Sequence, residues 1–162
     1  MVKIKFVKTD DKAKLPKRNH DNIPLDVEKD GEVSYVLEGT CDTCYDIYGI
    51  EGTTIPAKCS AIIPTGIKVG YITPGFWFKI EARSGLSFKH GIIPHPGVID
   101  NQYRGDTGVK LYNLSDKDYV VEPGERIAQI AVYPLVDFAV DWIETAEETE
   151  RGENGFGSSG KI

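Results

Sequence analysis

The sequence predicts an all-β fold, a sandwich or barrel built from short strands. Its 17 glycines and 9 prolines separate short runs rich in Val, Ile, Thr, Tyr and Phe, which are the residues that strands favour. Turn signals such as Pro74-Gly75 and Pro123-Gly124 lie between these runs. Strands this short, at this spacing, are typical of sandwiches and barrels.

Each expected element follows from its local pattern. Residues 1–6 alternate like a strand, and the polar residues 16–40 predict a loop that leads into a strand or hairpin at residues 33–37. Residues 84–90 are the one helix candidate inside the domain. Five further strands are expected, at residues 61–63, 66–69, 76–81, 108–113 and 127–133.

Composition excludes several function classes. The net charge of −6 repels polyanions, so extended nucleic-acid binding is not expected, although local donors can still bind a small phosphorylated ligand. No apolar run approaches the ~20 residues of a transmembrane helix, and the first residues lack the pattern of a signal peptide. We therefore expect a cytoplasmic protein with no membrane contact. Its 3 cysteines are expected to be reduced, including Cys41 and Cys44 in their C-x-x-C spacing.

The last twelve residues contain 4 glycines, which disfavours a helix or a central strand. They also carry an arginine that can bind phosphate through a forked hydrogen bond, Arg151, and an aromatic ring that can stack on a base, Phe156. This composition predicts a flexible arm, residues 151–162, that closes over a phosphorylated ring compound. A solvated linker is the alternative for this segment.

Five short segments each place glycine or a turn residue beside an acid, arginine, amide or aromatic side chain: residues 43–47, 82–87, 97–106, 124–129 and the C-terminal arm. In this order and character they resemble the five motifs of the homotrimeric dUTPase family. The first motif departs from the family pattern, because Thr43-Cys44 stands where Ala-Gly is usual. The resemblance runs from about Lys3 to the C-terminus, with residues 23–42 as an insertion or divergent stretch. It implies a jelly-roll-like barrel domain over residues 1–150.

The resemblance implies hydrolysis of dUTP to dUMP and pyrophosphate, with Asp100 as the general base for the attacking water. Taken alone, Asp100 reads as an aspartate in a turn after a strand. Tyr103 is expected to pack beneath the deoxyribose and exclude a 2′-hydroxyl, or to be an ordinary cross-strand tyrosine. A hairpin at residues 91–97 and the following strand are expected to form the uracil pocket, with the family positions Gly97, Val98, Ile99 and Gly108.

Phosphate binding is assigned to the helix start and to two further segments. Arg83 and the first helical residues can attract an anion, and the resemblance adds an amide and arm residues. The phosphate-binding set is Arg83, Ser84, Gly85, Gln129, Arg151, Gly157 and Ser158, while Phe156 of the arm is expected to stack on the base. Arg126 has a structural salt bridge as its alternative role. Mg²⁺ is the implied cofactor, because a triphosphate normally binds with this ion. The resemblance suggests that Asp46 orients a water bound to it.

The resemblance also implies a homotrimer whose active sites are shared between subunits and whose strands exchange. Two alternatives remain open from the sequence. A dCTP deaminase shares the fold and can be bifunctional, and a dUTPase-like regulatory binding protein would use residues 23–42 as a surface for a protein partner.

Overall fold

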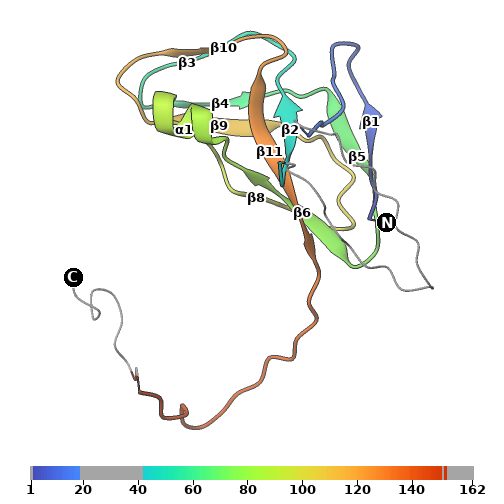
Figure 1. Ribbon diagram of the computed structural model, residues 1–162, viewed down its shortest axis with the longest axis vertical. Coiled ribbons are helices and arrows are strands. Elements are labelled where there is room, and N and C mark those ends of the chain that lie inside the picture. Colours follow the sequence, from blue (N-terminus) through green and yellow to red (C-terminus); the bar gives the residue numbers. More distant parts are fainter. Residues whose placement is uncertain (1, 19–41, 151, 153–162) are drawn as a thin grey trace.

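The computed structural model describes residues 2–18, 42–150 and 152. These residues form short strands and one helix (Figure 1). The elements are β1 Ile4–Lys8, β2 Tyr45–Tyr48, β3 Thr53–Ile55, β4 Ser60–Ile63, β5 Ile67–Ile72, β6 Phe76–Glu81, α1 Ser84–His90, β7 Ile92–Pro94, β8 Gly97–Ile99, β9 Val109–Asn113, β10 Tyr119–Val121 and β11 Arg126–Pro134.

The strands pair across long sequence separations, as in a jelly roll. A four-stranded sheet has the order β2-β11-β6-β8, and a three-stranded sheet has the order β4-β9-β7. Two pairs, β1-β5 and β10-β3, complete the arrangement, and all the pairings are antiparallel. The expected all-β, jelly-roll-like fold with one short helix is confirmed.

The core lies between these sheets and comes from alternating positions on the strands. In β9, Val109 and Leu111 are buried while Lys110 between them is exposed, the two-residue period of a strand with one face on the core. Phe78 of β6 is fully buried and meets the Phe6 ring edge-on, with ring centroids 6.2 Å apart. The same alternation turns the intervening side chains toward the surface, where the site residues gather.

Most expected elements are present within a residue or two of their predicted bounds. The helix 84–90 and the strand 76–81 are confirmed, and the strands expected at 61–63, 66–69, 108–113 and 127–133 correspond to β4, β5, β9 and β11. The strand at the N-terminus begins later, at Ile4. The strand expected just before Asp100 corresponds to β8, and four short strands were not predicted: β2, β3, β7 and β10. The segment expected at 33–37 lies outside the described residues.

The expected hairpin at residues 91–97 is wrong. β7 pairs with β9 in the three-stranded sheet, whereas β8 pairs with β6 in the four-stranded sheet, so the two strands join different sheets. Pro94 and Pro96 explain the split, because neither has a backbone N–H to donate to a strand partner. The segment is a crossover between sheets.

Beyond β11 the chain leaves the barrel. Residues 135–150 contain no helix or strand and run away from the sheets (Figure 1). This segment, which we call the extension, carries large exposed side chains: Leu135, Val136, Phe138, Val140, Trp142 and Ile143. Trp142 is 97% exposed, which is a costly position for the largest apolar side chain.

Candidate active site

A cleft of about 430 Å³ gathers those residues of the expected phosphate-binding set that the structure describes. Its walls come from β2, the end of β6, the start of α1 and the middle of β11. The cleft is lined by Asp42, Asp46, Ala82, Arg83, Ser84, Gly85, Ser87, Phe88 and Gln129. Three segments far apart in the sequence therefore bring an arginine, an amide and a helix start to one surface hollow.

A buried carboxylate holds two arginines at this cleft. Asp46 is 5% exposed, and its Oδ1 accepts a hydrogen bond from Arg83 Nε at 2.9 Å. Its Oδ2 accepts one from Arg126 Nη1 at 3.2 Å, and Arg83 Nη1 donates to the carbonyl oxygen of Arg126 at 2.9 Å. The salt bridge considered for Arg126 is confirmed. Because both oxygens of Asp46 face guanidinium groups, the carboxylate positions Arg83 in the cleft wall.

Gln129 and Gly85 shape the rest of the wall. The amide nitrogen of Gln129 donates to the carbonyl oxygen of Ala82 at 2.8 Å, which fixes the side chain and leaves the second amide hydrogen available for another acceptor. A Cβ atom built on Gly85 would have no neighbour within 4 Å. Packing therefore does not require a glycine here, and its small size keeps space free in the cleft.

Asp100 and Tyr103 occupy the two ends of one β-turn. Asp100 follows β8, and the backbone N–H of Tyr103 donates to the carbonyl oxygen of Asp100 at 3.0 Å. Both side chains are exposed, and the Tyr103 hydroxyl donates to the carbonyl oxygen of Asp106 at 2.8 Å. The ring lies over Gly105, where a Cβ atom would come within 2.3 Å of the Tyr103 hydroxyl. The expectation that Asp100 follows a strand is confirmed.

The remaining pocket positions lie on and near β8. Gly97, Val98 and Ile99 form this edge strand, in which Val98 is 58% exposed. A Cβ atom on Gly97 would approach Ile80 Cγ1 at 3.3 Å, so packing against β6 accounts for this glycine. Gly108 precedes β9, and a Cβ atom there would meet Ile62 at 3.4 Å.

Within a single chain, the Asp100–Tyr103 turn does not meet the cleft that holds Arg83 and Gln129. Gln129 of β11 pairs with Glu81, whereas Ile99 of β8, just before Asp100, pairs with Phe78, three residues earlier on β6. At about 3.3 Å per residue this is roughly 10 Å along β6, with β8 and β11 on opposite sides of that strand. Neither Asp100 nor Tyr103 lines the cleft that holds Arg83.

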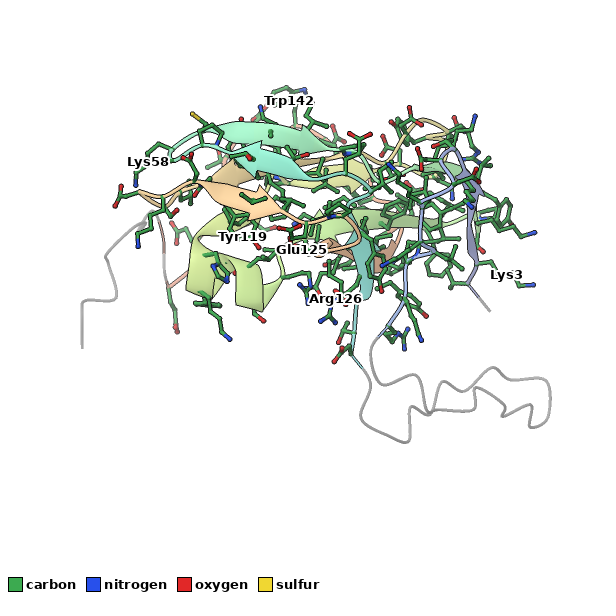
Figure 2. All side chains as sticks on the ribbon, turned by 90° about the horizontal axis from the view of Figure 1, so that it is seen from above. Lys3, Lys58, Tyr119, Glu125, Arg126 and Trp142 are labelled. Carbon is green, nitrogen blue, oxygen red and sulfur yellow. The ribbon has the colours of Figure 1, made fainter. Side chains whose placement is uncertain are left out.

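Two further features surround the site. The Tyr119 hydroxyl donates to Glu125 Oε1, and Figure 2 shows this pair beside α1. Burial, followed by this hydrogen bond, raises the pKa of Tyr119 above its ordinary value.

Burial, followed by the carboxylate of Glu81, raises the pKa of the Cys44 thiol. A raised pKa disfavours the thiolate, so Cys44 is poorly suited to redox or metal chemistry.

Several expected site residues cannot be placed. Arg151, Phe156, Gly157 and Ser158 lie outside the described residues, as do Cys41 and most of the stretch 23–42. Within residues 2–18, 42–150 and 152, no three His, Cys, Asp or Glu side chains form a group that could hold a metal ion. No helix in that part of the chain is both long and apolar enough to cross a membrane.

Comparison with known proteins gives one consistent result. The family model described as dUTPase matches residues 38–160. A deoxyuridine 5'-triphosphate nucleotidohydrolase of Candida albicans is 44% identical over 120 residues, which cover 72% of this chain and 74% of that protein. A protein of the same name from Oryza sativa is 42% identical over 116 residues, and the match covers 72% of this chain and 67% of that protein. The solved structure of Staphylococcus bacteriophage 80alpha dUTPase (G164S mutant) with dUpNHpp has a TM-score of 0.76 at 26% identity, and covers 98% of each chain.

Proposed function

The chain belongs to the dUTPase family and hydrolyses dUTP, and we propose that the water attacking the α-phosphorus loses its proton to Asp100. The products are dUMP and pyrophosphate. The observation that carries this proposal is the presence in one chain of a polar cleft around Arg83 and of an exposed carboxylate at the end of β8. The dUTP nucleotidohydrolases among its relatives favour this reaction over deamination of dCTP.

The cleft binds the triphosphate in this proposal. Arg83, held by Asp46, supplies a fixed positive charge and remaining N–H donors, while Ser84 and Gln129 supply uncharged donors. Gly85 leaves open space at the start of α1 for a phosphate group. Substrate entering this cleft meets donors that are already oriented, so little reorganisation is needed on binding.

In this proposal Asp100 acts on the water that attacks the α-phosphorus. A general base must lie within hydrogen-bond reach of the water and remain ionised near neutral pH. The exposure of Asp100 on a turn supports such access. Tyr103, three residues later, packs beneath the deoxyribose and leaves no room for a 2′-hydroxyl, which rejects ribonucleotides by steric exclusion. Gly97, Val98, Ile99 and Gly108 border the uracil pocket.

Two copies of the chain supply one complete site. The separation of Asp100 from the Arg83 cleft along β6 supports a site in which the turn of one subunit faces the cleft of another. We assign the assembly as a homotrimer with shared active sites, following the family. The extension and a second cavity supply a means of assembly.

An apolar groove of about 550 Å³ matches the extension in chemistry. It is lined mainly by apolar and aromatic side chains from residues 2–16 and from β2, β6 and β11, with Lys3, Lys5 and Arg18 also among the lining residues. Among the described strands, β1 pairs only with β5, so its other edge can accept a strand. In an extended chain, Val136, Phe138, Val140 and Trp142 would share one face, while Asp137 and Asp141 lie between them. The extension of one subunit therefore fills the groove of its neighbour.

Charge supports the same match. Residues 2–18 contain 7 basic and 2 acidic side chains, whereas residues 137–150 contain 6 acidic and no basic ones. Opposite charges steer the two segments together and fix their register more than they add affinity.

Mg²⁺ fits this cleft as a cofactor held mainly by the substrate. The ion keeps several waters and needs few protein ligands beside a triphosphate, so Asp46, whose oxygens already accept from two arginines, would act on it only indirectly, through a bound water. When bound, the ion offsets the negative charge that develops on the pyrophosphate leaving group. The arm residues Arg151, Phe156, Gly157 and Ser158 are assigned, as a prediction, to closing the loaded site.

The test is the Asp100→Asn variant assayed with dUTP, dCTP, dTTP and UTP in the presence of Mg²⁺. The unmodified chain should release pyrophosphate from dUTP far faster than from the others. The variant should lose turnover but still bind the analogue dUpNHpp. A variant that keeps its turnover, or that only loses nucleotide binding, would contradict the role of Asp100 as the base.

A further inference from the structure

The side chain of Asn101 ties the Asp100–Tyr103 turn to a second turn of the barrel. Its amide nitrogen donates to the carbonyl oxygens of Thr73 at 2.8 Å and Phe76 at 2.9 Å, and lies 3.4 Å from that of Ile72. An amide NH₂ group has two hydrogens, so the two short bonds use both and the third contact is weak. These partners lie 25 to 29 residues away in the sequence.

The chemistry of this contact requires a donor. Every partner is a carbonyl oxygen, so only the nitrogen end of the amide can face them. An aspartate has the same shape but would direct carboxylate oxygens at three carbonyl oxygens. Asn101 is half-buried, which makes the loss or inversion of these bonds more costly than it would be in water.

The partner turn is a firm anchor. Pro74 and Gly75 occupy its centre, Gly75 has φ +78°, and the N–H of Phe76 closes the turn on the carbonyl oxygen of Thr73 at 3.2 Å. Thr73 is also bound to Lys3 in both directions, because the N–H of each residue donates to an oxygen of the other. The anchor therefore belongs to the barrel and not to the turn that it holds.

Asn101 lies between Asp100, the proposed general base, and Tyr103, the residue proposed to select the sugar. It is the second residue of the β-turn whose first residue is Asp100 and whose fourth is Tyr103. Arg104 closes the turn from the other side, since its Nη1 donates to the carbonyl oxygens of Asn101 and Tyr103, each at 2.7 Å. Fixing Asn101 therefore fixes the backbone from which both side chains project.

We propose that Asn101 is a positioning residue for dUTP hydrolysis, whose side-chain amide holds the general base and the sugar-selecting tyrosine in register with the barrel. The proposal rests on the role assigned to Asp100 and Tyr103 above. It assigns to Asn101 a joint effect on turnover and on the choice between dUTP and UTP, because one tether serves both residues. Phosphate binding, which is assigned to the Arg83 cleft and does not depend on Asn101, should change little.

The experiment compares Asn101→Ala, Asn101→Asp and the control Gln102→Ala, which alters the neighbouring exposed residue of the same turn. For each variant kcat and KM are measured with dUTP and with UTP, together with the affinity for dUpNHpp. A displacement of about 1 Å in a catalytic group can cost about 100-fold in rate. We expect Asn101→Ala to lower kcat for dUTP by about 10-fold or more and to narrow the dUTP/UTP preference by a similar factor. The affinity for dUpNHpp should stay within about threefold of that of the unmodified enzyme, since the distant cleft contributes its main charged contact.

Asn101→Asp should be at least as impaired, and Gln102→Ala should behave like the unmodified enzyme. The ratio of kcat/KM values for dUTP and UTP does not depend on the fraction of folded enzyme, so a merely structural role would leave it unchanged. If Asn101→Ala does not fold, Asn101→Ser carries the same readout, because its shorter side chain keeps one hydroxyl donor.

If folded Asn101→Ala keeps the unmodified enzyme's ratio of kcat/KM for dUTP to kcat/KM for UTP, the proposal is overturned. Asp100→Asn is assayed in parallel to separate the two levels of inference. An active Asp100→Asn enzyme refutes the proposed base, whereas an inactive one beside an Asn101→Ala enzyme of normal selectivity refutes the positioning role alone.

Discussion

The buried ion network at Asp46 allows a prediction whose size follows from burial. The side chain of Asp46 is 7% exposed, that of Arg83 22% and that of Arg126 42%. Replacing Asp46 with alanine removes two charge-assisted hydrogen bonds and leaves two guanidinium groups without their shared counter-charge. Each such bond contributes about 1.5–3 kcal/mol, and losing one partner of a buried ion pair costs about 3–5 kcal/mol.

We therefore expect Asp46→Ala to lower the unfolding free energy by about 3–5 kcal/mol. In a chain of this size each kcal/mol lowers Tm by about 2–4 °C, so the expected shift is roughly 6–20 °C. The assay is denaturant and thermal unfolding at one fixed protein concentration, because the proposed assembly would make Tm depend on concentration. Turnover of dUTP should fall as well, since Arg83 loses the group that orients it.

Asp116 provides a matched control. It is also an aspartate in a salt bridge, with Lys58 Nζ at 2.9 Å, but its side chain is 89% exposed. Surface pairs of this kind contribute little, so Asp116→Ala should leave the unfolding curve nearly unchanged. If Asp46→Ala unfolds no more easily than Asp116→Ala, burial of the network does not stabilise the fold and the reasoning fails.

Three further predictions follow from single positions. Gly85→Ala should fold normally and weaken nucleotide binding, whereas Gly97→Ala should lower Tm, because only the second added methyl group meets its neighbours closely; equal Tm losses in the two variants would argue against this. Trp142→Ala should weaken self-association by about 3–5 kcal/mol per interface, measured by light scattering across a dilution series. Thr145→Ala is the control and should leave self-association unchanged. A Trp142→Ala assembly as stable as that of the unmodified chain would exclude the extension from the interface. Tyr119→Phe should be less stable than the parent at pH 7, and this deficit should shrink above about pH 10. The raised pKa of Tyr119 means that the parent loses stability as pH rises past the ordinary tyrosine value, and a constant deficit would contradict it.

Local patterns in the sequence were enough to predict the helix at 84–90 and the strand at 76–81, because glycine, proline and β-branched runs act over a few residues. β2 was not predicted, because a four-residue strand with an aspartate at its second position has no apolar signature. Asp46 is buried there beside arginines 37 and 80 residues away, which donate hydrogen bonds to its two oxygens. Such partners come from tertiary structure, which no local pattern encodes.

The candidate site divides in the same way. The end of a strand followed by turn residues predicted where Asp100 lies, and Gly85 and Gln129 were assigned through the family motifs. Nothing near Asn101 in the sequence indicated its three distant carbonyl partners. The prediction of a hairpin at 91–97 was wrong for a local reason. The two prolines that stiffen the segment also prevent it from pairing with itself.

The geometry of β6 links assembly to catalysis. This strand has β11, which carries Gln129, on one side and β8, which ends just before Asp100, on the other. The proposed phosphate-binding amide and the proposed general base are therefore held in one sheet. In a rigid sheet, hinge motion within the chain cannot bring Asp100 to the Arg83 cleft. In the proposed assembly a second copy closes this distance, and the apolar extension beyond β11 would be the part of the chain that the second copy buries. The same contact that buries Trp142 would then complete a site, so dilution that separates the subunits should remove activity while each barrel stays folded.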